Sequence, residues 1–248
     1  MNFTILRFDA IDSTNTEALN QARLGAAEGL CIVARRQTAG RGRHGRAWIS
    51  EADAGLYFSI VLRPKIETRF LPLMTLMTAV AVHDTLEEAF NLECDIKWAN
   101  DIHVRDKKIC GILAETADAA RGLAVVVGIG INLKSSNFPP EIAEIATSIE
   151  AESAQKINSD ELLEALTRFL DYHYEILHKA RGAEIIRQEW KRRSSYAFGK
   201  KVRVFLENET IYGTTGGIEE NGALRVLTDT GETRIIQAGD VEKLRREK

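Results

Sequence analysis

The stretch QTAGRGRHGRAW, residues 37–48, decides between two different folds for the first half of the chain. Its three glycines have the spacing of the dinucleotide-binding fingerprint, in which a helix follows the glycines at once and offers its N-terminus to a pyrophosphate. Here RAWISEADAGLYFSI follows, which predicts a turn and another strand. The region where a ribose-binding acid would stand reads SIVLRPK, and no Gly-Lys-Ser/Thr motif occurs. The loop is therefore neither a Rossmann fingerprint nor a P-loop.

The charge of this loop indicates a small anionic ligand. Five arginines lie between Arg35 and Arg46, and they repel one another unless an anion is present. The glycines allow backbone N–H groups to approach that anion closely. The whole chain has a net charge of -3 and a pI near 6.0, which does not suit a polyanionic partner. A solvated hairpin loop is the alternative interpretation of this stretch alone.

Working outward from the loop, the apolar patterns predict alternating strands and helices. Thr14 and Glu17 have the spacing of a capping box, and Gly25 is expected to stop that helix. Pro72 is expected to open a second helix, and residues 137–153 form a polar connection. The predicted strands cover residues 3–8, 30–36, 55–63, 94–98, two within 103–116, and 123–133; the predicted helices cover 12–25, a segment from 72, one from about 158, and 183–193.

The sequence pattern changes near the C-terminal end of the chain. From Gly199 onward, short strands alternate with turn signals such as Glu-Asn-Gly and Asp-Thr-Gly, which predicts a small all-β unit. With 248 residues, the chain suits one large unit and one small one. We therefore expect an α+β domain with a mixed sheet flanked by helices over residues 1–196, followed by a small β-barrel over residues 197–248.

Composition excludes several classes of protein. The cysteines Cys31, Cys94 and Cys110 form no CxxC pair and no zinc-ligand spacing, as expected in a reducing cytoplasm. The N-terminus has no basic segment followed by a long apolar run, so no signal peptide is predicted. The longest weakly polar run, GLAVVVGIGINL, is too short to span a membrane. We expect a cytoplasmic protein with no membrane partner.

Four further stretches carry polar groups suited to the same anion chemistry. DSTN (12–15) offers hydroxyl and amide groups at a helix start, where plain capping is the alternative. KWAND (97–101) offers a cation, an aromatic plane, an amide and a carboxylate at a strand end. DKKICGILAE (106–115) places Lys108 before a strand, and a solvated hairpin lysine is the alternative there. GIGINL (128–133) ends a buried strand with glycines, against which a flat ring can lie.

In this order and spacing, these motifs resemble the biotin–protein ligase family, also called biotin–[acetyl-CoA-carboxylase] ligase. The resemblance covers about Phe3 to Leu133, and the small C-terminal β unit agrees with it. It implies a catalytic domain like class II aminoacyl-tRNA synthetases and a Src-homology-3-like barrel. In one departure, Ala99 stands where the family usually has proline. In another, the chain begins directly at the catalytic motifs, so we expect no helix-turn-helix and no DNA-binding role.

The resemblance also implies an activity and its partners. Biotin would be activated by ATP and Mg²⁺ as biotinyl-5′-AMP, and then transferred to a lysine of a biotin carboxyl carrier protein domain. No enzyme nucleophile is needed, so catalysis rests on positioning and charge stabilisation. A homodimer is compatible with the sequence, which does not fix the oligomeric state, the carrier, the metal ligands or the role of the barrel.

Carried over by motif, the resemblance assigns roles to individual residues. Arg43 and Lys108 are the expected catalytic residues, because they would lie at the biotin carboxylate and the α-phosphate. For Trp48, stacking on adenine and a role as a core anchor both stay open. The expected biotin-binding residues are Ser13, Thr14, Asn15, Gln37, Gly40, Arg41, Gly42, Arg43, Lys108 and Gly111. The expected ATP-binding residues are Arg43, Arg46, Trp48, Lys97, Asn100, Asp101, Gly130 and Asn132, with Asn100 and Asp101 as candidates for ordering the site or holding Mg²⁺.

Two rival functions remain. A lipoate or octanoate ligase shares the fold and the adenylate chemistry, but the Arg-Arg-x-Ser-Gly-Gly-Gly loop that such enzymes share is absent here. A nucleic-acid-binding protein would use Lys200, Lys201 and Arg203 of the barrel. The glutamates of the same region, Glu207, Glu209, Glu219 and Glu220, argue against a phosphate-tracking face.

Overall fold

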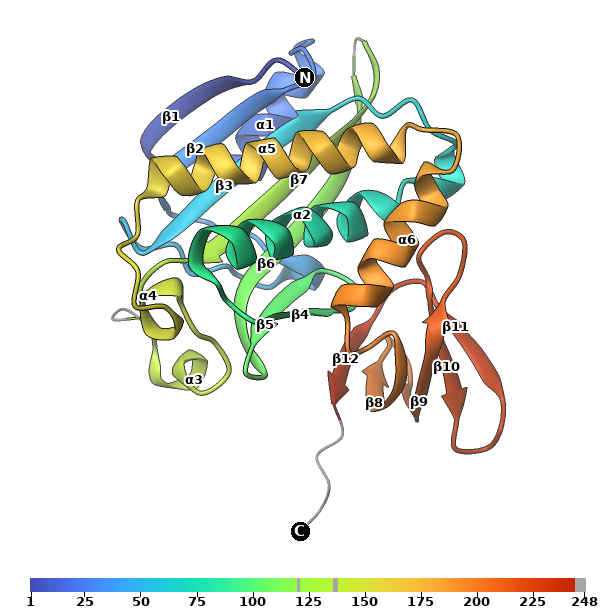
Figure 1. The fold of residues 1–248 in the computed structure, drawn as a ribbon. Coiled ribbons are helices and arrows are strands. Elements are labelled where there is room, and N and C mark those ends of the chain that lie inside the picture. The colour runs from blue at the N-terminus through green and yellow to red at the C-terminus, as the bar shows by residue number, and fades with distance from the viewer. Residues whose placement is uncertain (120, 136–137, 244–248) are drawn as a thin grey trace.

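The computed structural model describes residues 1–119, 121–135 and 138–243, and they form two β-sheets (Figure 1). In the larger sheet only β1 and β2 run parallel, and the other neighbours pair antiparallel, which makes it a mixed sheet. In spatial order its strands are β1 (Thr4–Ile11), β2 (Leu30–Gln37), β3 (Gly55–Leu62), β7 (Gly122–Asn132), β6 (Lys107–Ala119), β5 (Asp101–Val104) and β4 (Cys94–Lys97).

Helices cover both faces of this sheet. Helices α2 (Leu73–Phe90) and α5 (Ser159–Leu177) pack on one face, and α1 (Thr14–Arg23) packs on the other. Successive side chains of a strand point to opposite faces. In β7, Val125 and Val127 accordingly join the core under α2, whereas Ala124 and Val126 join the core under α1. Positions further along β7 that face α1 are glycines, which leaves space on that face.

The predicted start of α1 is wrong in one detail. Ser13, and not Thr14, is the N-cap residue, and its hydroxyl accepts a hydrogen bond from the N–H of Thr16. Glu17 does not reach back to the cap, because its carboxylate accepts a hydrogen bond from Gln21 at 2.7 Å. Thr14 is therefore free to point into the site described below.

The segment predicted as a polar connection contains two short helices, α3 (Pro140–Ala143) and α4 (Ile149–Glu152). Helices of four residues are too short to show a periodic pattern, which explains why the sequence did not reveal them. Between them, the carbonyl of Ile145 accepts from the N–H of Lys108 at 2.9 Å, and the N–H of Thr147 donates to the carbonyl of Lys108 at 2.9 Å. The connection is thus attached on both sides to the start of β6.

An ion-pair network joins the helices on the α2 face. Asp84 of α2 accepts from His173 of α5 at 2.9 Å and from Arg193 of α6 (Gly182–Arg193) at 2.6 and 3.1 Å. Burial opposes the charge of Asp84, but the hydrogen bonds from His173, His83 and Arg193 hold its pKa well below the usual range. This network fixes α6, which leads into the second sheet.

The second sheet follows α6 and is entirely antiparallel. Trp98 donates its indole N–H to the carbonyl of Gly222 at 2.9 Å, and Arg46 forms an ion pair with Asp240, so the two sheets are in contact. The predicted α+β class, with a mixed sheet flanked by helices and a small all-β unit, is confirmed, while the division between residues 196 and 197 stays a prediction. In spatial order the strands are β11 (Thr233–Ile236), β10 (Leu224–Thr228), β9 (Thr210–Ile218), β8 (Phe198–Phe205) and β12 (Asp240–Lys243).

In the part of the chain that the structure describes, no helix combines the length and the apolar character that a membrane span requires.

Candidate active site

A small pocket lies on the face of the larger sheet that carries α1. Its floor is made by Gly111 of β6 and by Gly128 and Gly130 of β7. A Cβ at Gly128 would lie 2.1 Å from Oδ1 of Asn15, and a Cβ at Gly130 would lie 2.5 Å from the ring of Trp48. Only glycine therefore allows these two side chains to lie directly on the strands. The space that remains has a volume of about 50 Å³.

Polar groups at the start of α1 form one wall of this pocket, which we call the small pocket. Gln37 Oε1 accepts from the N–H of Thr14 at 2.8 Å and from its hydroxyl at 3.0 Å. The hydroxyl of Ser59 lies 2.8 Å from Thr14 Oγ1 and 2.6 Å from Asn15 Oδ1. Asn15 Nδ2 donates to Glu115 at 2.8 Å. Because these groups hold one another, their directions are set before any ligand binds.

The glycine–arginine loop, residues 39–47, forms another wall and is folded as a tight hairpin. The N–H of Trp48 donates to the carbonyl of Gly40 at 2.8 Å, and the N–H of Gly42 donates to the carbonyl of Arg46 at 2.7 Å. At its tip, His44 has a φ of 54°, in the left-handed region. A Cβ at Gly40 would lie 2.4 Å from the carbonyl oxygen of Trp48, so this glycine is needed for the hairpin.

Two arginines of the loop line the small pocket, and they differ in their partners. Arg41 forms an ion pair with Glu115 at 2.6 Å, which ties the loop to β6. Arg43 donates to the amide oxygen of Asn100 at 2.7 Å, and none of the described residues forms an ion pair with it. Burial lowers the pKa of Arg43, although the charge of Asp101 acts in the opposite direction. A half-buried cation with only an amide partner favours binding of an anion.

Lys108 stands where the small pocket meets a larger one. Its ammonium group lies 2.7 Å from Oδ1 of Asp101 and 5.3 Å from the centre of the Trp48 ring. Lys108 and Trp48 line both pockets. The indole N–H of Trp48 is buried and makes no hydrogen bond to the described residues, so it is a donor available to a ligand. The ring packs on the glycine floor and does not insert into the apolar core.

The larger pocket has a volume of about 1030 Å³ and lies between the two sheets. Burial lowers the pKa of Lys97, which faces this space together with Lys108 and Arg46. Burial likewise lowers the pKa of His103 to about 4, with Lys97 adding to the effect. A group of cations that includes the desolvated Lys97, beside an open space, suits a polyphosphate. The α3 segment and the second sheet complete the walls with Phe138, Ile142, Ile145, Ala146, Tyr196, Arg203, Glu242 and Lys243.

The structure brings all the residues predicted from sequence except Gly40 to these two connected pockets; Gly40 lines neither and lies in the hairpin of the loop. Asn132 lines the larger pocket, but its amide group is engaged, because Nδ2 donates to the carbonyl of Thr147 at 3.0 Å. Asn132 therefore holds the α3–α4 connection in place. Arg46 is exposed and paired with Asp240. Of the predicted site residues, Ser13, Thr14, Asn15, Gln37, Arg41, Gly42, Arg43, Trp48, Asn100, Lys108, Gly111 and Gly130 line the small pocket, while Arg46, Trp48, Lys97, Asp101, Lys108 and Asn132 line the larger one.

Other residues of the site were not predicted from the sequence. Glu115 and Ser59 connect the polar wall. Glu115 is the last residue of the stretch DKKICGILAE, but the motif gives it no role, and Ser59 lies outside the motifs on the α1 face of β3. The walls from the α3 segment and the second sheet depend on tertiary packing, which a local pattern does not reveal.

One group of metal-ligating side chains lies away from these pockets. His83, Asp84 and Glu87 of α2 are close enough to bind one ion together. Among the described residues, no other group of histidine, cysteine or carboxylate side chains is close enough to do so. Arg193 donates to both oxygens of Asp84, so its positive charge already occupies the position that a cation would need. We interpret this group as part of the helix-joining network.

Comparison with known proteins agrees with this geometry. The Biotin/lipoate A/B protein ligase family matches residues 7–132, and the Biotin protein ligase C terminal domain matches residues 197–244. The chain is 37% identical over 243 residues to the Bifunctional ligase/repressor BirA of Bacillus subtilis, covering 96% of this chain and 73% of that protein. It is 31% identical over 239 residues to the Biotin--[acetyl-CoA-carboxylase] ligase of Paracoccus denitrificans, covering 93% and 96%.

Comparison with a solved structure of a biotin protein ligase shows that the fold is similar as well. The biotin protein ligase from Aquifex aeolicus in complex with biotin and ATP superposes with a TM-score of 0.83 at 29% identity, over 97% of this chain and 98% of the other. Sequence, fold and site thus lead to one assignment. The chain belongs to the Biotin/lipoate A/B protein ligase family.

Proposed function

We propose that this protein is an ATP-dependent biotin–protein ligase, which activates biotin as biotinyl-5′-AMP and transfers it to a lysine of a carrier protein. One observation carries the proposal: a small pocket of pre-arranged neutral hydrogen-bonding groups opens, at Lys108 and Trp48, into a large pocket whose lining holds five lysine and arginine side chains against three carboxylates. Biotin combines a neutral polar ring with an anionic chain end, and ATP carries the phosphates. The complex of the Aquifex aeolicus ligase with biotin and ATP supports the same pair of substrates.

The small pocket suits the ureido ring of biotin. The donors and acceptors of Ser13, Thr14, Asn15 and Gln37 surround a narrow space on a glycine floor. A ureido group has both N–H donors and a carbonyl acceptor, and each one left unpaired in such a site would cost about 1–3 kcal/mol. The fixed hydrogen-bond network therefore selects for this ring and against an apolar ring.

Arg43 and Lys108 are placed to act at the reacting atoms. In the first step a biotin carboxylate oxygen forms a bond to the α-phosphorus of ATP, and the bond to the departing pyrophosphate breaks. Carboxylate and triphosphate repel each other, so cations must hold them together. We assign this role to Arg43, which reaches from the loop, and to Lys108, which stands where the two pockets meet. Their positive charge also stabilises the additional charge of the transition state.

The larger pocket would hold the nucleotide. Lys97 and Arg46 provide positive charge for the phosphates, and Trp48 offers an unpaired indole N–H. The apolar side chains Ile142 and Ile145, beside Lys108, are suited to cover the adenine ring. Asn132 positions that segment through its bond to Thr147.

Magnesium fits this site with Asp101 as its protein ligand. Mg²⁺ is usually held by one or two carboxylates together with substrate phosphates. Asp101 is a half-buried carboxylate beside Lys97 and Lys108, and it faces the larger pocket. The ion would neutralise phosphate charge there, and Asn100 would order the site through its hydrogen bonds to Arg43 and to the carbonyl of Ile112.

In the second step the lysine amine of the carrier attacks the acyl carbon of biotinyl-5′-AMP. The new C–N bond forms, the acyl C–O bond breaks, AMP leaves with the electron pair, and the amine releases one proton to solvent. We propose the carrier domain of a biotin-dependent carboxylase as the acceptor.

A reducing cytoplasm is the proposed location, supported by the three cysteines being free thiols. Of the three barrel residues considered for nucleic acid, Arg203 pairs with Glu242 and Lys200 lies 3.7 Å from Asp95, while Lys201 is exposed.

The test is pyrophosphate exchange into ATP, measured with biotin, with lipoate and without either acid. We expect exchange with biotin and MgATP only. Mass spectrometry after incubation with an apo carrier domain should show one biotinyl group added to the carrier. Exchange with lipoate but not with biotin would overturn the proposal in favour of the lipoate branch of the family. Arg43→Ala should reduce exchange at least about tenfold, because a charge-assisted contact is worth roughly 1.5–3 kcal/mol.

A further inference from the structure

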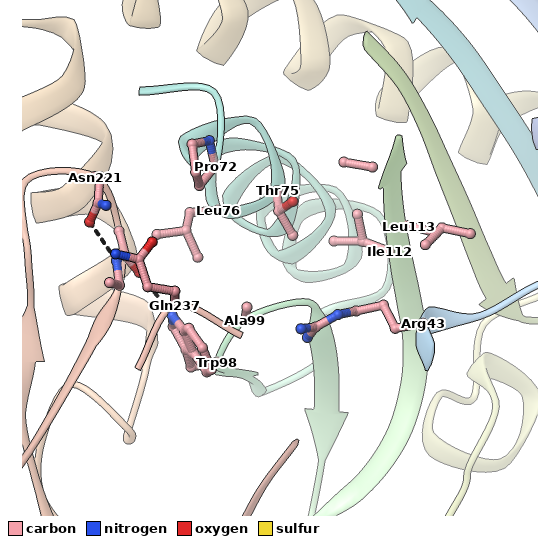
Figure 2. Close-up of a pocket in the computed structure, with 13 residues that line it drawn as sticks. Arg43, Pro72, Thr75, Leu76, Trp98, Ala99, Ile112, Leu113, Asn221 and Gln237 are labelled. Atoms are coloured by element: carbon pink, nitrogen blue, oxygen red, sulfur yellow. Dashed lines mark hydrogen bonds between the residues drawn. The ribbon is translucent and has the colours of Figure 1, made fainter. Parts of the chain in front are cut away.

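A third cavity, of about 140 Å³, lies where the two sheets meet, and it differs from both pockets described above (Figure 2). Its walls come from the first turn of α2, from β6, from Trp98 and Ala99, and from two connections of the second sheet. Those connections contribute Asn221–Ala223 and Gln237. The role proposed for the protein leaves this cavity without an assignment.

Specific contacts build the wall that the second sheet contributes. The carbonyl of Gly222 accepts from the indole N–H of Trp98 at 2.9 Å. Gly222 has a φ of +88°, and a Cβ there would lie 2.9 Å from Leu76 and 3.0 Å from Leu73 of α2. The connection thus sits on α2 in a conformation that favours glycine. The cavity is therefore a feature of the packed fold and not a loose gap.

Arg43 joins this cavity to the small pocket. Arg43, Ile112 and Leu113 line both spaces. Strand β5 pairs with β6 only as far as Gly111, so the edge of β6 beyond that residue is not covered by β5, and the cavity lies there. Figure 2 shows the guanidinium group of Arg43 pointing into the cavity from the side opposite Asn221 and Gln237. None of its described lining residues also lines the larger pocket, so it approaches Arg43 from the side away from the nucleotide.

The shape of the cavity suits a thin, partly apolar chain. Pro72 and Gln237 are exposed, whereas Leu76 and Trp98 are buried, so the cavity runs inward from the surface. One water occupies about 30 Å³ of liquid, so the cavity has room for several heavy atoms in a row. A lysine side chain is a flexible four-carbon stem that ends in an amine.

The charge of the cavity suits that amine in its reactive form. Its polar lining consists of Arg43, Thr75, Asn221 and Gln237, and none of the described lining residues is acidic. A neighbouring cation lowers the pKa of an amine, and so does removal from water. Lysine attacks as the neutral amine, so a passage that ends beside Arg43 and lacks a carboxylate favours the nucleophile.

We propose that this cavity is the entry channel for the acceptor lysine of the carrier protein, with Thr75 on its wall and Gln237 at its mouth. The inference rests on the proposed ligase function. The channel delivers the amine to the acyl group beside Arg43, while AMP remains in the larger pocket. The two connections that contribute Asn221–Ala223 and Gln237 thereby take part in the transfer step and not in activation.

Two variants test the channel by separating the two half-reactions. Thr75→Met narrows the cavity in a helix that accepts methionine, and Gln237→Arg adds bulk and positive charge at an exposed position. For both, we expect biotin-dependent pyrophosphate exchange to stay within about twofold of the unchanged protein. Transfer from preformed biotinyl-5′-AMP to an apo biotin carboxyl carrier domain should fall about tenfold or more, because small displacements of a nucleophile are costly. Thr233→Met, on the exposed side of β11, is the matched control.

Hydroxylamine provides a second measurement in the same variants. It is a small nucleophile that does not need the channel, so its reaction with bound biotinyl-5′-AMP should be unchanged. Normal transfer to the carrier in both variants would overturn the channel. Equal losses in exchange and transfer would also overturn it, because the cavity would then serve the first step, for example as an anion site. Absence of exchange in the unchanged protein would instead reject the proposed function itself.

Discussion

The small pocket and the larger pocket are adjacent, but they are built in opposite ways. The small pocket, of about 50 Å³, is lined by groups that bond to one another on a glycine floor. The larger pocket, of about 1030 Å³, has more cations than carboxylates in its lining and draws its walls from both sheets. The difference indicates that the first pocket selects a ligand by fixed geometry, whereas the second binds by charge and leaves space for groups to move. Lys108 and Trp48 belong to both.

The largest effect is expected at the boundary of the pockets. Lys108→Ala should lower kcat for exchange by about a hundredfold or more, since a charge at the reacting atoms is removed. The biotin KM should rise less, because the contact strengthens in the transition state. Steady-state exchange kinetics provide the measurement. Lys107→Ala is the matched control, because among the described residues the side chain of Lys107 donates to the carbonyl of Ala143 alone, at 3.2 Å. A pure KM effect would place Lys108 in ground-state binding.

A substitution in the glycine floor should weaken biotin binding and leave ATP binding nearly unchanged. Gly128→Ala places a methyl group 2.1 Å from Oδ1 of Asn15, and the resulting displacement should weaken biotin binding by about 1–3 kcal/mol. The ATP KM should hardly change. Titration calorimetry with biotin measures the effect. Gly216→Ala, where the nearest atom lies 3.6 Å away, serves as the control. Equal losses for biotin and ATP would show that the pockets are not independent.

Glu115 tests whether the hydrogen-bond network sets the geometry of the small pocket. Glu115→Gln keeps an acceptor for Asn15 but loses the ion pair with Arg41. Both partners of that pair are partly exposed, so the biotin KM should rise only about fivefold, or about 1 kcal/mol, with kcat little changed. Asp118→Asn, an exposed carboxylate on the same strand, is the control. A selective fall in kcat would instead place Glu115 at the reaction centre.

The smallest effect concerns the larger pocket and appears as a pH dependence of stability. Burial lowers the pKa of His103 to about 4, below its ordinary value of about 6.5. Between these values the unfolded chain binds more protons, so the contribution of His103 is complete above pH 6.5 and is lost as the pH falls toward 4. Urea unfolding of His103→Gln should therefore show a weaker decrease than the unchanged protein over this range. An equal slope in both would show that His103 is not desolvated. His44→Gln, in the exposed loop, is the control.

Much of the fold followed from local patterns. The apolar run of β7 and the start of a helix near residue 158 are visible in the sequence. In the structure Asn158 caps that helix, because its side chain accepts from the N–H groups of Asp160 and Glu161. Ser13 and Thr14 both suit an N-cap, and only the chain path in three dimensions decides between them. Helices α3 and α4 are too short to leave a periodic signal.

The candidate site was predictable where it stands in motifs. Gly111 of β6 and Gly130 of β7 are register partners, which brings two distant motifs side by side. Glu115 ends the stretch 106–115, but its role depends on the partners it meets in the folded protein, which the motif does not show. Arg203 and Glu242 come from the second sheet, and no local pattern shows where that sheet packs. The functional roles of all these residues stay predictions until the variants are measured.

The placement of the larger pocket between the sheets has a consequence for how the molecule unfolds. A ligand that contacts both Lys97 and Arg203 binds only when both sheets are folded and packed together. Its binding free energy then stabilises their association as well as each sheet, in proportion to the logarithm of its concentration over Kd. We therefore expect a saturating nucleotide to raise the melting temperature of both sheets together.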